Sequence, residues 1–171
     1  DPKGMVEELY KQGYHVNLWE HAFTHTSSPF YEKMLPYSAN YEVWGGLVPD
    51  FSCVEARGIF ADYHAKSVTF GLIDGFKLDE CDGSDYTKGW TFPLCSEFPS
   101  GMDGEQYHSL FGTLYMQTML PIMGETLSEV RNAGALCASY PFVLYSDLYA
   151  HKDFIRGLAT AGFSGLLWTP E

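Results

Sequence analysis

Two aspartates, Asp79 and Asp147, each stand at the end of a short apolar segment of the sequence. Asp79 closes the segment GLIDGFKLD, and Asp147 follows PFVLYS. Cleavage of a glycosidic bond needs two carboxyl groups: one attacks the sugar or activates water, and the other donates a proton to the leaving oxygen. If both segments are parallel strands, the two carboxylates can converge on one sugar. The chain has 22 acidic residues, however, so such a pair also arises by chance.

The elements that must position these aspartates alternate between helix and strand. We predict helices over 2–13, 54–65, 108–120 and 153–162, and strands over 14–19, 71–79, 127–131, 142–145 and 164–168. Long irregular segments, 20–50 and 80–106, follow the first two strands. This order favours a parallel β/α arrangement with its site at the carboxyl ends of the strands. About five strands are expected where a complete TIM barrel has eight, so the chain is either a smaller α/β domain or part of a barrel.

Apolar spacing also predicts the buried faces of two of these helices. The helix over 54–65 is expected to turn Val54, Ile59 and Tyr63 inward. The last helix is expected to bury three further apolar residues, Phe154, Ile155 and Leu158.

Composition narrows the classes of partner. The net charge is −12 with only 10 Lys and Arg residues, a balance that repels nucleic acid. No apolar run approaches the roughly 20 residues of a membrane helix. The first residues lack the pattern of a signal peptide and are expected to enter in mid-fold, so a targeting segment upstream is not excluded. Cellular location and oligomeric state therefore stay open.

Four stretches of the chain, in order, resemble glycoside hydrolase family 31. YEVWGGLVPDF, from Tyr41, is similar to the W-P-G…P-D-F stretch of that family, and DGFKLDE is similar to its nucleophile strand. YHSLFG, over 107–112, resembles the H-N-x-Y-G that opens the following helix. Arg131, the pair Tyr140-Pro141 and Asp147 resemble the R…Y-[AP]…W-x-G-D acid/base segment. Together the four stretches cover most of the chain.

The resemblance implies an α/β fold, a partial (β/α)8 TIM barrel of roughly strands 3 to 7. It implies that residues 1–171 are one fragment of a catalytic domain whose flanking strands and accessory domains are absent. The implied reaction is retaining α-glycoside cleavage through a covalent glycosyl-enzyme intermediate, without a metal or organic cofactor. Asp79 matches the nucleophile and Asp147 the acid/base, with their carboxyl groups about 5–5.5 Å apart. The partner is an oligosaccharide or glycoside, and the expected substrate-binding residues are Trp19, Trp44, Lys77, Arg131 and Glu171.

The expected sugar preference is based on Lys77. Two residues before the matched nucleophile, it resembles the K-x-D variant of α-xylosidase-like and α-galactosidase-like branches, where α-glucosidases usually have Trp. An ammonium there can donate to a sugar hydroxyl, whereas an indole presents a flat wall. We therefore expect α-xylosides or α-galactosides to be preferred over α-glucosides.

Other interpretations remain at this point. Leu144-Tyr145-Ser146-Asp147 replaces W-x-G-D, and LLWTPE replaces the H-D-x-G-G run of many members, which favours a non-catalytic carbohydrate-binding relative. A transglycosylase of the same family is equally compatible with these residues. Arg131 also has a structural interpretation as the partner of a structural acid, Lys77 as an interior charge, and Trp44 as part of the core. His21 and His25 lack a third ligand, so no metal site is expected.

Overall fold

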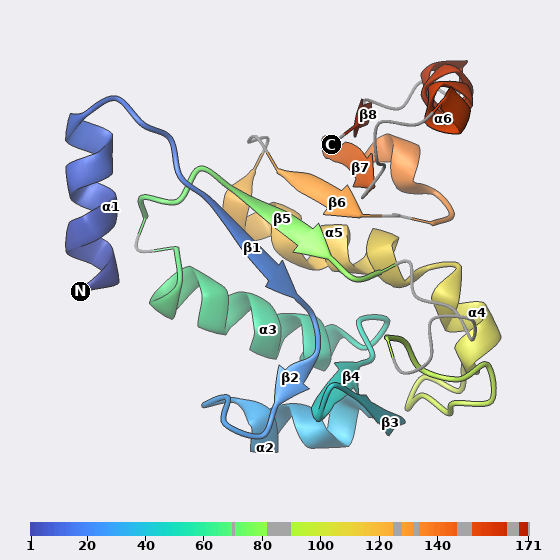
Figure 1. Ribbon diagram of the computed structural model, residues 1–171. Helices are drawn as coiled ribbons and strands as arrows, with labels where there is room; N and C mark the ends of the chain where they lie inside the picture. The colour runs from blue at the N-terminus through green and yellow to red at the C-terminus, as the bar shows by residue number, and fades with distance from the viewer. Residues whose placement is uncertain are drawn as a thin grey trace.

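The computed structural model describes residues 1–69, 71–81, 90–124, 128–131, 134–146, 152–163 and 168–170. Its centre is a five-stranded parallel sheet in the order β1-β5-β6-β7-β8 (Figure 1). The strands are β1 (Asn17–His21), β5 (Gly75–Asp79), β6 (Glu129–Arg131), β7 (Val143–Ser146) and β8 (Trp168–Pro170). The predicted parallel α/β class is therefore confirmed, although the first strand begins and ends later than the 14–19 expected.

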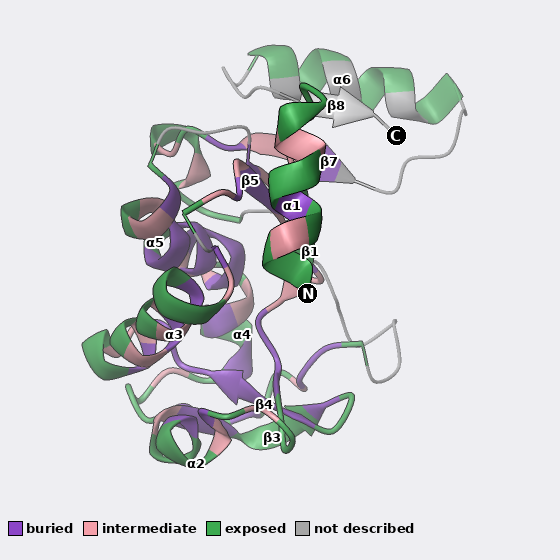
Figure 2. Ribbon diagram, turned by 90° about the vertical axis from the view of Figure 1, so that its left-hand side faces the viewer, coloured by how far each residue is buried: buried purple, intermediate pink, exposed green. Residues whose placement is uncertain are grey.

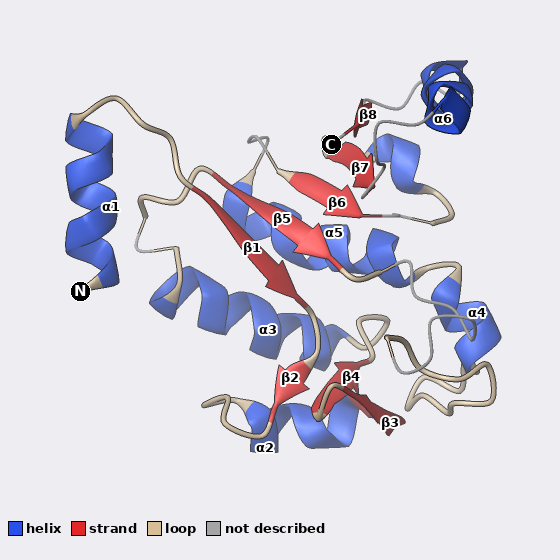
Figure 3. Cartoon of the chain, in the orientation of Figure 1, coloured by secondary structure: helices blue, strands red, loops and turns tan. Residues whose placement is uncertain are grey.

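One helix precedes this sheet, and others lie between β1 and β5, between β5 and β6, and between β7 and β8 (Figure 3). Their bounds are α1 (Pro2–Lys11), α3 (Val54–Ser67), α4 (Gly104–His108), α5 (Phe111–Met123) and α6 (Lys152–Phe163). The helix expected over 108–120 corresponds to α5, and α4 lies mostly within the segment 80–106 that was expected to be irregular. An intact capping box starts α4, in which the Asp103 carboxylate accepts from the Gln106 N–H and the Gln106 side chain accepts from the Asp103 N–H.

The main core lies where α3 and α5 cover one face of β1 and β5 (Figure 2). Phe76 and Leu78 leave β5 on this face and are almost completely buried. They meet a cluster of aromatic rings in which Phe51 stacks on Tyr115 and contacts Phe60 edge to face. Burial of these large rings fixes the two helices to the back of the sheet and leaves its other face to the polar side chains.

The segment 20–50, expected to be an irregular loop, contains a second sheet. Strands β2 (Thr24–His25), β3 (Ser38–Val43) and β4 (Gly46–Pro49) are antiparallel in the order β2-β4-β3, beside α2 (Tyr31–Met34) and the 3₁₀ helix η1 (Leu35–Tyr37). Trp44 and Gly45 close the β3–β4 hairpin with φ values of 51° and 70°. Such values are those of a type I′ turn, whose twist matches that of the two strands. The prediction failed because short strands leave little periodicity.

The predicted buried face of α3 is wrong, and so is one residue of the predicted face of α6. In α3 the buried residues are Ala56, Phe60 and His64, while Val54 is 66% exposed. Ile59 and Tyr63 are half-buried because they face α2 rather than the sheet. Apolar residues lie around much of this helix, so spacing alone did not identify the face toward the sheet.

In α6, Ile155 is 66% exposed instead of buried, because α6 lies at the edge of the sheet and the described residues do not cover it (Figure 1). The side chains of Phe154 and Leu158 lie outside the described part. Within that part, no helix combines the length and apolar character needed to cross a membrane.

Candidate active site

The face of the sheet opposite α3 and α5 gathers most of the predicted site residues. In the parallel register Trp19 pairs with Lys77 and His21 with Asp79. Paired residues, and residues two apart on one strand, share a face. The same face continues across the sheet, because Lys77 pairs with Glu129 on β6 and Arg131 pairs with Tyr145 on β7. It therefore carries polar and aromatic side chains from four strands.

Asp79 ends β5 and is 5% exposed. The Trp19 indole donates to Oδ2 over 2.5 Å, and the backbone N–H of Glu80 donates to Oδ1 over 2.8 Å. Glu80 has a φ of 63°, in the left-handed region that residues other than glycine rarely adopt. The Arg131 guanidinium lies 3.4 Å from Oδ1. Both carboxylate oxygens are therefore held, by groups from β1, β6 and the turn after β5.

These contacts set the charge of Asp79. Burial raises the pKa of its carboxyl, but hydrogen bonds from Trp19, Tyr145 and the Glu80 N–H, with the charge of Arg131, lower it further than burial raises it. The resulting pKa lies below the ordinary value of an aspartate. A carboxylate held ionised in this way is suited to attack on carbon and is unsuited to proton donation at neutral pH.

Exposed aromatic rings extend from Asp79 toward solvent. Trp19 contacts His21 edge to face at 5.4 Å, and His21 lies 5.3 Å from Trp44, which is followed by Trp90 at 6.1 Å. Trp19, Trp44 and Trp90 are 55%, 43% and 49% exposed, so Trp44 is no core residue. Burial lowers the pKa of His21, which favours a neutral ring. Trp90 was missed from the sequence, where its one signal is a tryptophan in a polar loop after the Asp79 strand.

Lys77 lies one pleat before Asp79 on the same face. Its ammonium is 4.4 Å from the centroid of the Tyr145 ring, a cation–π distance. Tyr145 also helps to lower the pKa of Asp79, and its side chain is almost completely buried. Tyr145, the second residue of the LYSD segment, therefore contacts Lys77 and acts on the charge of Asp79, and it is a second site residue that sequence reasoning overlooked.

Two predicted site residues, Asp147 and Glu171, lie outside the described residues. Strand β7 ends at Ser146, so Asp147 follows it directly in the chain. In the sheet β7 is separated from β5 by β6 alone. The predicted distance between the carboxyl groups of Asp79 and Asp147 remains a prediction.

His108, in the YHSLFG stretch, is held in the packing between α4 and the preceding loop. Its Nε2 lies 3.0 Å from the carbonyl oxygen of Phe92, and its ring stacks on the Phe92 ring at 4.2 Å. His108 therefore has a structural role. Among the residues that the structure describes, no group of three or more His, Cys, Asp or Glu side chains is arranged to hold a metal ion.

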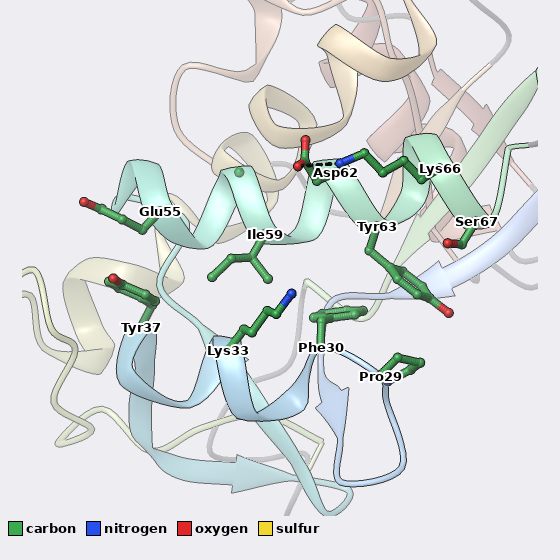
Figure 4. A pocket seen from close by; sticks show the side chains of 11 residues that line it. Pro29, Phe30, Lys33, Tyr37, Glu55, Ile59, Asp62, Tyr63, Lys66 and Ser67 are labelled. Atoms are coloured by element: carbon green, nitrogen blue, oxygen red, sulfur yellow. Dashed lines mark hydrogen bonds and ion pairs between the residues drawn. The ribbon is translucent and has the colours of Figure 1, made fainter.

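A separate groove of about 710 Å³ lies between α2 and α3, on the other side of the main core (Figure 4). Its floor contains the Phe30, Ile59 and Tyr63 side chains, and its rim includes the Asp62–Lys66 ion pair at 3.0 Å. None of the described site residues lines this groove.

The parallel β/α sheet thus holds an ionised aspartate at the strand end where β/α barrels place catalytic groups. The sequence matches the model of the glycosyl hydrolases family 31 TIM-barrel domain over residues 1–169, and the chain belongs to that family. None of the curated proteins matches it significantly.

Solved structures share the fold. The cycloalternan-degrading enzyme from Trueperella pyogenes, in complex with a covalent intermediate, superposes with a TM-score of 0.77 at 20% identity; the match covers 100% of this chain and 26% of that enzyme. The cycloalternan-forming enzyme from Listeria monocytogenes, in complex with a pentasaccharide substrate, gives 0.70 at 22% identity over 99% of this chain and 18% of that enzyme. The chain thus spans about a quarter or less of these two proteins.

Proposed function

We propose that this chain carries the nucleophile of a retaining α-glycosidase that removes terminal α-linked sugars from oligosaccharides or glycosides. The observation that carries the proposal is Asp79. It is an ionised carboxylate at the carboxyl end of a parallel strand, with both oxygens fixed by donors and an aromatic wall beside it. This is the position at which β/α barrels place catalytic groups.

The proposed reaction has two steps. An Asp79 oxygen attacks the anomeric carbon while the bond to the leaving oxygen breaks and Asp147 protonates that oxygen. In the second step Asp147 removes a proton from water, the water oxygen bonds to the anomeric carbon, and the ester bond to Asp79 breaks. Asp79 supports the first role by its low pKa. Asp147 is assigned by its place directly after β7 and by the resemblance of its segment.

The side chains around Asp79 have separate roles in this proposal. Arg131 and Trp19 hold the carboxylate until it attacks, since each contacts one of its oxygens. Trp44 and Trp90 supply flat, exposed surfaces on which sugar rings stack. Glu171, next to β8 in sequence, is proposed to contact the sugar on the strength of its position alone.

The sugar preference rests on Lys77. Its ammonium faces the same side as Asp79 and supports the proposed preference for α-xylosides or α-galactosides over α-glucosides. One observation opposes this preference: a solved structure with a similar fold is in complex with isomaltose, which is an α-glucoside. Comparison of kcat/KM on the three aryl α-glycosides, in the wild type and in Lys77→Trp, decides this point.

The extent of the chain supports a proposal on the whole protein. The described part of the chain contains five parallel strands, and the family match runs from residue 1 to residue 169. We therefore propose that these strands are part of a barrel and that further sequence of the full-length protein supplies its other strands. The activity tests below therefore refer to the full-length protein.

Trapping of the intermediate tests the proposed function. An activated fluoroglycoside, whose fluoride leaves without a proton donor, is expected to form an ester on Asp79, found by mass spectrometry of the peptide that contains GFKLDE. A label on another carboxylate, or none with any of the three sugars, contradicts the nucleophile. Product analysis with an added acceptor sugar then separates hydrolysis from transglycosylation.

A further inference from the structure

A buried polar cluster lies directly behind the site, on the face of β1 that meets the helices. Glu20 stands between Trp19 and His21 and points the opposite way. Its Oε2 is 2.6 Å from Nε2 of His64 on α3, and its Oε1 accepts from the Tyr115 hydroxyl on α5 over 2.7 Å. The His64 and Glu20 side chains are only 7% and 14% exposed. One carboxylate therefore joins β1 to both helices of the core.

The hydrogen bonds of His64 determine how many protons the cluster holds. Nδ1 lies 2.8 Å from the carbonyl oxygen of Phe60, which only accepts, so Nδ1 carries a hydrogen. Nε2 faces a carboxylate oxygen at 2.6 Å, and a contact that short needs a hydrogen between the two atoms. The pair Glu20–His64 therefore holds one proton more than a carboxylate beside a neutral imidazole.

The pKa of His64 is raised above that of an ordinary histidine, so the shared proton is retained to a higher pH. Burial lowers the pKa of His64, but the hydrogen bond to Glu20 and its charge raise it by more. Tyr115 keeps its proton, because burial and then Glu20 raise its pKa well above the ordinary value. The side chains around the His64 ring are otherwise aromatic: Phe30, Phe60, Tyr63 and Phe76. Two other titratable side chains, those of Cys81 and Asp79, also raise the pKa of Tyr115.

We infer that Glu20, held by His64 and Tyr115, is a positioning residue that fixes β1 so that the Trp19 indole reaches Asp79. The inference rests on the proposed function of Asp79. Trp19 is adjacent to Glu20 in the strand, and its Nε1 lies 2.5 Å from Asp79. When the shared proton leaves at high pH, Nε2 of His64 faces Glu20 with a lone pair, the contact becomes repulsive, and β1 loses its bond to α3.

The sign of the effect follows from the raised pKa. The Glu20–His64 bond is complete at pH values below the ordinary histidine pKa, and it is lost as pH rises through the higher pKa of His64 in the folded protein. The rate of attack by Asp79 is expected to fall over the same range.

Glu20→Gln separates positioning from mere packing. The glutamine amide donates to a neutral His64 and its oxygen still accepts from Tyr115, so the variant keeps both bonds without the shared proton. We expect the trapping rate by the activated fluoroglycoside to fall about tenfold at high pH in the wild type and to stay level in Glu20→Gln. Fluoride needs no proton donor, so the titration of Asp147 contributes little to this rate.

Two further variants complete the test. Tyr115→Phe removes one bond without changing charge and is expected to slow trapping several-fold at every pH while the pH dependence remains. Glu55→Gln, the same change on the exposed surface of α3, is expected to match the wild type. Identical pH profiles for the wild type and Glu20→Gln, with the label on Asp79, overturn the inference alone; absence of label on Asp79 in the wild type overturns the proposed function. If Glu20→Gln does not fold, wild-type trapping by Tyr115→Phe overturns the inference.

Discussion

The two faces of strand β5 hold their side chains by different means. On the face toward α3 and α5, Phe76 and Leu78 are 1% and 0% exposed and are fixed by apolar packing. On the other face, Asp79 is fixed by hydrogen bonds from other side chains and from the next residue, and its neighbour Trp19 is 55% exposed. The same strand thus provides stability on one side and chemistry on the other, and substitutions should separate the two.

Burial and hydrogen bonding do not by themselves identify the reactive carboxylate. Asp50, after β4, is more buried than Asp79 and also has both oxygens bonded. Its donors are the Ser52 N–H and hydroxyl on Oδ1 and the Ser100 N–H on Oδ2, all of which tie loops together. The distinction lies in the surroundings, because Asp79 alone of the two has a cation and exposed indoles beside it.

The largest effect is expected for Asp79→Asn. Loss of the nucleophile should reduce kcat/KM by about 10⁴-fold or more, while the loss of the stability from its bonds should be modest. The matched change, Asp50→Asn, should do the reverse: it should cost about 1–3 kcal/mol of unfolding free energy and leave kcat/KM near wild type at low temperature. Activity of Asp79→Asn equal to that of Asp50→Asn would contradict the assignment.

Leu78→Ala is expected to affect stability only. Truncation of this fully buried side chain should lower the free energy of unfolding by about 2–5 kcal/mol, measured by urea denaturation. Lys77, the preceding residue on the other face of β5, provides the control. Lys77→Ala should lower the free energy of unfolding far less than Leu78→Ala and should reduce activity more. A Leu78→Ala variant as stable as Lys77→Ala would mean that the core does not lie on the α3–α5 face.

Arg131→Gln should move the acid limb of the activity profile. In the wild type the low pKa of Asp79 keeps the nucleophile ionised, and both activity and the stability from its bonds are lost only as pH falls through that lowered value. Without the Arg131 charge the pKa of Asp79 should rise, so the acid limb of kcat/KM should shift to higher pH. If the acid limb stays at the wild-type pH while kcat is reduced, Arg131 acts only by binding the sugar and does not affect the pKa of Asp79.

The smallest effect on stability is expected for Trp44→Gly. Relief of the left-handed conformation at φ 51° should offset the lost ring contacts, so the free energy of unfolding should stay within about 1 kcal/mol of wild type. KM for an oligosaccharide should rise several-fold because the stacking surface is gone. Trp44→Tyr keeps a ring and should retain the wild-type KM; a several-fold increase there as well would point to the turn rather than to stacking.

The sequence was sufficient for the features that local pattern determines. Asp79 was predicted at a strand end because an apolar run stops there, and the parallel class followed from the order of elements. The bond from Trp19 to Asp79 and the link of Lys77 to Tyr145 depend on strand register, which a single sequence does not reveal. The inward face of α3 was missed because two different surfaces, the sheet and α2, cover opposite sides of that helix.

Because the Trp19 indole donates a hydrogen bond to Asp79, the fluorescence of Trp19 should report on the chemical state of that carboxylate. Formation of an ester on Asp79 removes the carboxylate charge next to the indole, and a change in that local field shifts the emission of a tryptophan. The chain contains four tryptophans, of which Trp19 alone is described as donating to the nucleophile. Stopped-flow fluorescence with the activated fluoroglycoside should therefore record the attack step, and Trp19→Phe should remove the part of the signal that follows the labelling of Asp79, while any change from sugar stacking on Trp44 and Trp90 remains.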